Sequence, residues 1–363
     1  MQHDFNEYKK RHLAFWSLQD VKSPLIGFTI GAGLDSWSYW QYNSAAQKLF
    51  AQEKIQPEDI NPNDFVEEQQ SYLELSGQIN DDICRSAMPL ASIPWMEAIL
   101  GCPIVSAGSH LSTEKILDDP ESYSKIQINT DNPWVKKYLE FIQVYNNYFN
   151  GKYPVGQSVL RGPSDLVCAL MGVENASIAL LMQPEAMQRL LEYVSVQLEQ
   201  FLKLQLSALP KFKGGYVIGQ YEIWAPEPAI RIQEDSSMHY SPELYEKYLK
   251  SNDERIASVS NYTLIHLHSS SLILIDKFLE VSQIEAFQIT KDQGIVKLED
   301  MLPGLMKIQK AGKSLIIKGV FNDSDLQLIK KNISVAGLCL QPVVSNVMEA
   351  EQMLSRLRTL WDG

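Results

Sequence analysis

Short apolar stretches alternate with longer amphipathic stretches through most of the chain. From residue 184 onward apolar stretches of strand length alternate regularly with segments whose apolar residues recur at helical spacing. This order is typical of a parallel sheet with crossover helices. The expected strands are residues 24–31, 153–160, 214–219, 229–235, 263–271, 286–290, 313–319 and 337–344.

The expected helices carry sequence signals at their ends. Asn132 precedes Pro133 and is a natural N-cap, and Ser241 likewise precedes a proline. Ser164 follows a proline and is predicted to cap the next helix. The expected helices are residues 1–19, 65–76, 132–149, 164–171, 184–209, 241–260, 272–280, 297–311, 322–331 and 347–361.

The order of these elements predicts the fold. At least seven strand–helix steps follow one another, and the first 110 residues have room for an eighth. A single α/β domain over residues 1–363, folded as a (β/α)8 TIM barrel with an extended N-terminal region, fits this better than a doubly wound sheet. No linker rich in glycine, serine or proline divides the chain.

The amino-acid composition limits which binding partners and which cellular compartment are expected. The net charge of −12 disfavours binding to nucleic acid or to an anionic membrane surface. The charged first 18 residues do not form a signal peptide, and no apolar run approaches the ~20 residues of a spanning helix. Four cysteines lie far apart, as expected for reduced thiols in a cytoplasmic protein.

Two histidines stand near the end of the expected strand at residues 263–271, Thr-Leu-Ile-His-Leu-His-Ser-Ser-Ser. His266 and His268 are two residues apart, so in a strand both side chains leave the same face. In an α/β barrel the C-terminal strand ends carry the working groups. The pair is expected to bind a metal or to act as an acid/base pair; the alternative is that one is a hydrogen-bonded core histidine.

Three carboxylates are candidate catalytic groups. Glu234 and Asp235 close an expected strand, where a barrel keeps its working carboxylates, although an acid there also caps a following helix. Glu97 lies beside Trp95 in an apolar run. An unpaired buried charge is costly, so Glu97 is expected to be either a buried base or an ion-paired structural acid.

Four residues are candidates for substrate binding. Arg161 follows an expected strand and is predicted to clamp an anionic group, or else to pair with Asp165. Lys318 is a lone cation at another strand end. Trp37 and Trp95 are expected either to line a broad apolar pocket or to pack in the core.

A series of short motifs runs in order over about 200 residues of the C-terminal part. They are Gly-Pro-Ser-Asp at 162–165, Gln-Pro-Glu at 183–185, His-Tyr-Ser-Pro-Glu at 239–243, Ile-His at 265–266 and Asn-Val-Met-Glu-Ala-Glu at 346–351. With these motifs the chain resembles the uroporphyrinogen decarboxylase superfamily. The resemblance implies a TIM barrel that is either a decarboxylase of tetrapyrrole biosynthesis or a zinc methyltransferase acting on methyl-corrinoids.

Each branch implies different site residues. The decarboxylases hold substrate carboxylates with an arginine-rich loop after the first strand, where residues 28–33 contain no arginine. The methyltransferases bind zinc through His-x-Cys and a second cysteine, and the zinc holds a thiol substrate as its thiolate. His266 matches that histidine, His268 replaces the first cysteine, and Cys339 lies about three residues before the second. The carboxylates that could complete a His/His site are Glu97, Glu222, Glu234 and Asp235.

Three hypotheses follow. The first is metal-assisted methyl transfer, with His266 and His268 as zinc ligands and a corrinoid-carrying protein as partner. The second is decarboxylation of a carboxylated tetrapyrrole or a smaller acid, with Asp235 as acid/base and Arg161 as the anion clamp. The third is a barrel that binds a ligand or a corrinoid protein without turnover. The oligomeric state, a homodimer included, is left open.

Overall fold

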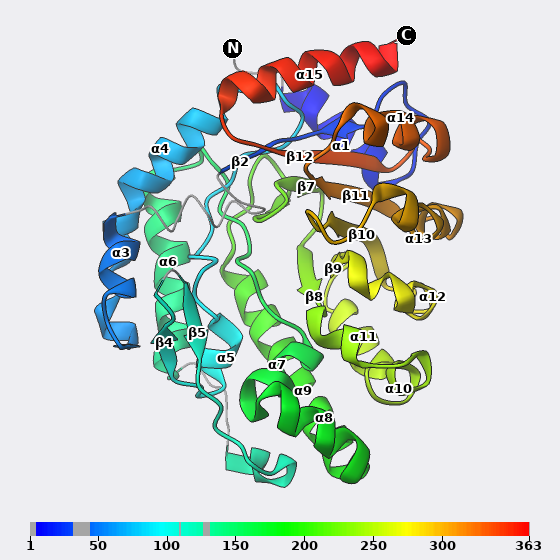
Figure 1. The fold of residues 1–363 in the computed structure, drawn as a ribbon. Helices are drawn as coiled ribbons and strands as arrows, with labels where there is room; N and C mark the ends of the chain where they lie inside the picture. Colours follow the sequence, from blue (N-terminus) through cyan, green and yellow to red (C-terminus); the bar gives the residue numbers. More distant parts are fainter. Residues whose placement is uncertain (1–4, 32–43, 109, 126–130, 363) are drawn as a thin grey trace.

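In the computed structural model, which describes residues 5–31, 44–108, 110–125 and 131–362, seven strands form one parallel sheet (Figure 1). The strand order is β1-β12-β11-β10-β9-β8, and β2 also pairs with β12. The strands are β1 (Leu25–Ile26), β2 (Thr29–Ile30), β8 (Ala229–Gln233), β9 (Tyr262–His268), β10 (Ile284–Lys291), β11 (Ser314–Gly319) and β12 (Leu338–Val344).

Helices connect these strands and cover the outer side of the sheet (Figure 1). The predicted cap at Ser241 is confirmed, because its side chain accepts a hydrogen bond from the Leu244 backbone N–H at 3.2 Å. The helices after β8 are α10 (Pro242–Tyr248), α11 (Lys250–Ala257), α12 (Ile275–Phe278), α13 (Leu298–Lys310), α14 (Asp323–Asn332) and α15 (Val347–Asp362).

The first half of the chain is mostly helical. The predicted cap at Asn132 is confirmed by hydrogen bonds from the backbone N–H groups of Trp134 and Val135. A small antiparallel sheet lies beside these helices, formed by β3 (Lys54–Ile55), β4 (Ile104–Ser106) and β5 (Leu111–Thr113). The helices are α1 (Phe5–Trp16), α3 (Ser44–Phe50), α4 (Val66–Ser76), α5 (Trp95–Ile99), α6 (Pro133–Phe149), α7 (Pro163–Met171), α8 (Val173–Met182) and α9 (Pro184–Ala208).

The expected strand at residues 153–160 does not join the backbone ladder of the sheet. It makes one isolated parallel bridge, Ala87 to Val155. The Gln157 side chain forms the hydrogen bonds with β8 that the backbone of a neighbouring strand would otherwise form. Its Oε1 accepts from Arg231 N and its Nε2 donates to Arg231 O, both at 2.8 Å. The described strands therefore form an open parallel arc, and closure into a full barrel stays a prediction.

The predicted strand at 214–219 also lies outside this sheet. It forms β6 (Tyr216–Ile218), which pairs antiparallel with β7 (Ile223–Ala225) in a separate hairpin. This hairpin packs against the inner face of the sheet: Ile218 and Ile223 belong to one buried cluster with Leu264, Ala286, Ile316 and Cys339.

The inner face of the sheet changes from apolar to polar along the strands. Leu264, Ala286 and Cys339 are buried in the apolar layer. Two residues further along each strand, on the same face, come His266, Gln288 and Gln341, all buried. A polar layer therefore covers the C-terminal half of the inner face, where chemistry is expected in folds of this kind.

Within the described part of the chain, no single helix is long and apolar enough to cross a membrane. The α7–α8 pair passes that test only when both helices are taken together, and it is bent by 107°.

Candidate metal centre

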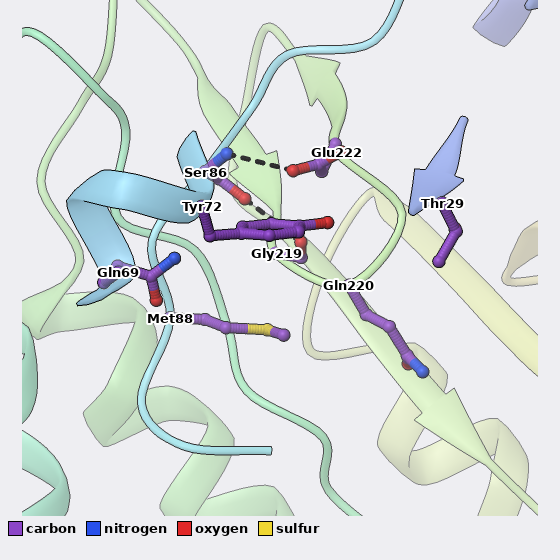
Figure 2. A pocket seen from close by; sticks show the side chains of 8 residues that line it. All are labelled: Thr29, Gln69, Tyr72, Ser86, Met88, Gly219, Gln220 and Glu222. Carbon is purple, nitrogen blue, oxygen red and sulfur yellow. Dashed lines mark hydrogen bonds between the residues drawn. The ribbon is translucent and has the colours of Figure 1, made fainter. Parts of the chain in front are cut away.

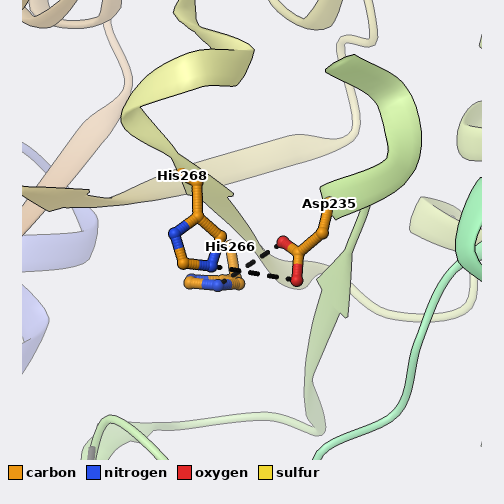
Figure 3. A group of neighbouring side chains, drawn as sticks. All are labelled: Asp235, His266 and His268. Carbon is orange, nitrogen blue, oxygen red and sulfur yellow. Dashed lines mark ion pairs between the residues drawn. The ribbon is translucent and has the colours of Figure 1, made fainter. Parts of the chain in front are cut away.

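Asp235, His266 and His268 converge at the C-terminal ends of β8 and β9 (Figure 3). The parallel register pairs Gln233 of β8 with His266 of β9, so the next inward-facing position after β8 is that of Asp235. His266 and His268 leave β9 on the same face, as their spacing predicts. Strand alternation and register are thus sufficient to bring the three groups together.

The distances fit three ligands of one ion better than a hydrogen-bonded triad. His266 Nε2 lies 3.6 Å from Asp235 Oδ1, and His268 Nε2 lies 3.8 Å from Asp235 Oδ2. These separations are too long for hydrogen bonds. Two ligand atoms of a tetrahedral zinc ion are ~3.3 Å apart, given metal–ligand distances of about 2.0 Å. The potential ligand atoms all lie within 4.8 Å of one another.

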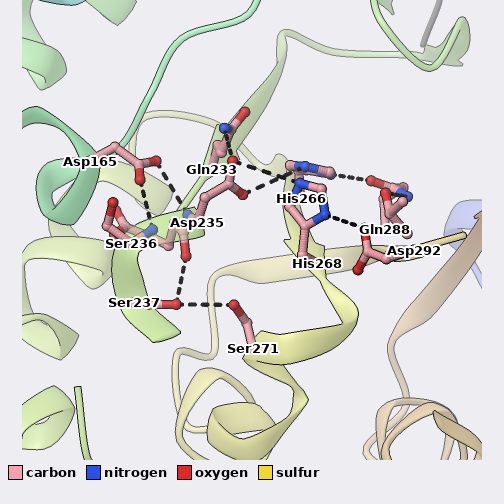
Figure 4. Close-up of polar contacts among 12 residues, drawn as sticks. Asp165, Gln233, Asp235, Ser236, Ser237, His266, His268, Ser271, Gln288 and Asp292 are labelled. Carbon is pink, nitrogen blue, oxygen red and sulfur yellow. Dashed lines mark hydrogen bonds and ion pairs between the residues drawn. The ribbon is translucent and has the colours of Figure 1, made fainter. Parts of the chain in front are cut away.

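The other nitrogen of each ring is held by a neighbouring side chain (Figure 4). His266 Nδ1 lies 2.8 Å from the Tyr221 hydroxyl and also contacts Gln288 Oε1. His268 Nδ1 lies 2.6 Å from Asp292 Oδ1. Such contacts fix the ring orientation and direct Nε2 toward the metal in histidine metal sites.

The protonation states also suit a metal. Burial lowers the pKa of His266 well below its ordinary value, and the positive charge of Arg231 lowers it further, so the imidazole is neutral and able to ligate. Burial and the nearby Asp165 raise the pKa of Asp235 to about 6. Asp235 Oδ1 is buried and receives no hydrogen bond from the described residues. A bound cation would stabilise this carboxylate, so the residues fit a metal ion.

The donor set defines the class of metal. Two imidazoles and one carboxylate leave coordination positions open, as in catalytic metal sites. The same set suits zinc, iron(II) and other first-row divalent ions. Zinc itself therefore stays a proposal.

Glu234 does not belong to this cluster, because neighbouring residues at the end of β8 point to opposite sides. Its side chain accepts hydrogen bonds from the backbone N–H and the hydroxyl of Ser164. The predicted cap at Ser164 is wrong: the N-cap of α7 is Gly162, and Ser164 lies in the first turn. Glu234 also lies near Asp253, whose negative charge raises the pKa of Glu234 and whose carboxylate accepts from the Tyr245 hydroxyl at 2.6 Å. We therefore leave Glu234 out of the proposed site.

The buried pair of Glu234 and Asp253 predicts a pH-dependent stability. Burial raises the pKa of Asp253 to about 7 and that of Glu234 well above its usual value. Between about pH 4, where both groups titrate in the unfolded chain, and pH 7 the folded protein holds more protons, so this contribution to stability is lost as pH rises. Between pH 5 and pH 8 the free energy of unfolding of Asp253→Asn should fall by about 1–2 kcal/mol less than that of the wild type. Urea unfolding at the two pH values measures the difference.

The exposed Asp20→Asn is the control for that experiment, and it should reproduce the wild-type pH profile. Equal slopes for wild type and Asp253→Asn would show that Asp253 does not hold a proton in the folded protein at these pH values.

Asp165 fixes the backbone that carries Asp235 (Figure 4). Its carboxylate accepts from Ser236 N at 2.7 Å and from Asp235 N at 3.2 Å. Gly162 packs closely against the end of β8. A Cβ atom on Gly162 would overlap Glu234 Oε1 and the carbonyl oxygen of Gln233. The start of α7 and the end of β8 are thus locked together.

We expect Gly162→Ala to destabilise the protein by about 1–3 kcal/mol and to weaken metal binding, because the added methyl group pushes the Asp235 backbone away from Asp165. Thermal unfolding and metal titration measure the two effects. Gly304→Ala, in α13, is the control, since its new Cβ meets only the flexible Leu272 side chain, at 3.0 Å. A Gly162→Ala protein with wild-type stability would contradict the packing argument.

Glu97 and Arg161 form an ion pair, with Arg161 Nη1 3.0 Å from Glu97 Oε1. Glu97 is 1% exposed, whereas the Arg161 side chain is 42% exposed. Burial raises the pKa of Glu97, and Arg161 offsets part of that rise. The predicted partner of Arg161 was Asp165; the main partner is Glu97, with Asp165 and Asp235 also close enough to raise the pKa of the guanidinium.

The remaining predicted binding residues lie in different surroundings. Trp95 is a core residue: its indole donates to Leu90 O at 2.8 Å, and its ring packs edge-on against Tyr138. Trp37 lies outside the described residues. Lys318 is 2% exposed in the polar layer, with its ammonium 5.7 Å from the centre of the Tyr221 ring.

Two further predicted candidates for ligands are excluded by position. Glu222 pairs with Arg85 at 2.7 Å, and its carboxylate also accepts from Ser86 N, at the side of a small polar cavity (Figure 2). Cys339 is fully buried in the apolar layer, where burial raises its thiol pKa well above the usual value. Of the four carboxylates considered from the sequence, Asp235 is the one that meets the histidines.

Sequence reasoning missed four residues of the site. Asp292 follows β10 as Asp235 follows β8, so strand-end position alone could have identified it. Gln288 and Arg231 occupy inward-facing positions of β10 and β8. The sequence shows polar residues within apolar strands, but it does not show which face of each strand points inward. Tyr221 comes from the turn between β6 and β7, and nothing in its local sequence signals contact with His266, 45 residues away.

No protein-family model and no curated protein matches the chain. Among solved structures, a methyltransferase from Methanosarcina mazei matches with a TM-score of 0.66 and 13% sequence identity, over 98% of this chain and 99% of that chain. The predicted resemblance to the uroporphyrinogen decarboxylase superfamily stays a prediction at this level of identity. What the comparison establishes is that the chain shares its fold with a methyltransferase over nearly the whole length of both proteins.

Proposed function

We propose that this protein is a methyltransferase that transfers a methyl group from a methyl-corrinoid, carried by a partner protein, to a thiol. The observation that carries the proposal is the convergence of Asp235, His266 and His268 at the C-terminal end of a parallel sheet. The shared fold with a methyltransferase supports the same reaction class. A zinc ion held by these residues would lower the pKa of a bound thiol and make it a nucleophile at neutral pH.

The reaction balances as a nucleophilic displacement at carbon. The sulfur forms a bond to the methyl carbon, the methyl–cobalt bond breaks with its electron pair left on cobalt(I), and the thiol proton goes to solvent. The chain's own residues contribute orientation: Tyr221 and Gln288 hold the ring of His266, and Asp292 holds that of His268. Asp165 fixes the Asp235 backbone.

Decarboxylation is the second candidate, and one observation favours it. A pKa of about 6 leaves Asp235 able to exchange a proton near neutral pH, as an acid/base group requires. Its predicted anion clamp is weakened, because the Arg161 guanidinium already faces Glu97. A barrel that binds ligands without turnover is the third candidate. It predicts that the histidines can be changed with no loss of ligand affinity.

The test is methyl transfer from methylcobalamin to a small thiol by the zinc-loaded protein. Loss of the methylcobalamin absorbance and formation of the thioether, detected by mass spectrometry, are the two readouts. We expect turnover with the wild type and a loss of at least 100-fold in His268→Ala. Thioether formation at the same rate with and without protein would overturn the proposal; carboxylated ligands would then be screened for loss of carbon dioxide.

A further inference from the structure

A cavity of about 100 Å³ lies between the start of α5 and β5, and Arg161 is among the residues that line it. Five of its lining residues are apolar and buried: Ala91, Ile93, Pro94, Leu111 and Val159. Its ionisable lining residues are Glu97, Arg161 and the exposed His110. It is therefore a mainly apolar pocket with one carboxylate, one guanidinium and one imidazole, none of which the proposed methyl transfer uses.

Glu97 is the more unusual of the two charges. It is 1% exposed, and its Oε1 receives no hydrogen bond from the described residues that meets normal geometry. The contact with Arg161, at 3.0 Å, is thus an ion pair without an aligned hydrogen bond. A ligand that donates a hydrogen bond stabilises a buried carboxylate oxygen that has no aligned donor.

The cavity adjoins the metal centre through the segment that carries Arg161. Leu160 O accepts a hydrogen bond from Arg231 at 3.3 Å, and Gly162 packs against the end of β8. Asp235 is close enough to raise the pKa of Arg161. Arg161 therefore connects the two sites: its guanidinium pairs with Glu97 in the cavity lining and interacts with Asp235 of the metal centre.

The charges around Arg161 decide which kind of group fits. Glu97 pairs with this one guanidinium, and Asp165 and Asp235 are close enough to raise its pKa. A fourth anion would compete with carboxylates already in place, whereas an N–H donor supplies what Glu97 Oε1 lacks. We propose that the cavity is the subsite for the non-reacting end of the substrate, and that this end is a primary amine recognised by Glu97. The inference rests on thiol methyl transfer and narrows the acceptor to an aminothiol.

Binding of thiol-free probes to metal-free full-length protein tests the subsite on its own. We expect propylamine to bind at least tenfold more tightly than propionate or 1-propanol in calorimetric titrations. Glu97→Gln should reduce propylamine binding at least tenfold. Ala91→Leu, which keeps the charge and fills the cavity, should do the same. Tighter binding of propionate, or binding of none of the three probes, would overturn the subsite.

A second measurement connects the subsite to the reaction. With the zinc-loaded protein and methylcobalamin, kcat/KM should be at least tenfold higher for 2-aminoethanethiol than for mercaptoacetate, and Glu97→Gln should remove this preference. The two proposals fail separately. Propylamine binding without methyl transfer would contradict the proposed function but not the amine subsite. Equal turnover of all thiols would contradict the amine subsite but not the proposed function.

Discussion

The double variant His266→Ala/His268→Ala is expected to lose the metal that the wild type binds. Protein purified without a histidine tag, loaded with zinc and dialysed, should hold about one ion per chain in the wild type and almost none in the variant. The physical reason is geometric: two of the three donors that lie within 4.8 Å of one another are removed. Metal analysis by mass spectrometry measures the ratio.

Graded variants separate ligands from the residues that orient them. Asp292→Asn keeps all three donors but removes the charge that holds the His268 ring, so we expect 10–100-fold weaker binding rather than complete loss. His239→Ala is the matched control, because His239 is exposed and lies outside the cluster. Circular dichroism confirms that each variant is folded, and His268, at 39% side-chain exposure, is the safer single substitution.

If the wild-type protein retains no metal, the cluster of Asp235, His266 and His268 cannot activate a thiol through a metal ion. Asp235 and the two histidines would then be studied as an acid/base group beside an uncharged imidazole. Equal metal in the wild type and the double variant would place the ion elsewhere on the protein.

The parallel sheet and the core of this site follow from local sequence patterns. The strands from β8 to β12 are short apolar stretches separated by amphipathic helices, which is the signal that the sequence carries most clearly. His266 and His268 share a face because the side-chain period of a strand is two. Asp235 was predictable from its place after a strand, since the carboxyl ends of parallel strands meet at one edge.

Long-range pairing accounts for what the sequence did not reveal. Residues 153–160 have a strand-like composition, but the Gln157 side chain occupies the hydrogen-bonding positions on Arg231 that a neighbouring strand would use. Arg161 finds its main partner 64 positions earlier, in Glu97, although Asp165 is nearer in sequence. Glu234 and Asp235 look equivalent in sequence, and only strand alternation sends them to opposite sides.

Arg85→Met is expected to destabilise the protein by about 3–5 kcal/mol, the largest effect on stability that the structure predicts. Arg85 is buried and binds three acceptors: the carboxylates of Asp81 and Glu222 and the carbonyl oxygen of Phe28. Methionine fills a similar volume but leaves two carboxylates buried without this cation. Urea unfolding at pH 7.5 measures the loss, and Lys54→Met, which breaks an exposed pair with Glu114, should cost less than about 1 kcal/mol.

The pH dependence of that loss identifies its cause. Burial, together with the nearby Glu222 and Asp82, already raises the pKa of Asp81 to about 7, although Arg85 lowers it. Without Arg85 both carboxylates should take up protons at still higher pH, so the folded variant binds more protons than its unfolded chain and gains stability as the solution is acidified. The difference from wild type should therefore be greatest above pH 7 and smaller at pH 5. Adding Asp81→Asn and Glu222→Gln to Arg85→Met should restore part of the stability at pH 7.5, whereas a loss independent of pH and of these substitutions would assign the effect to packing.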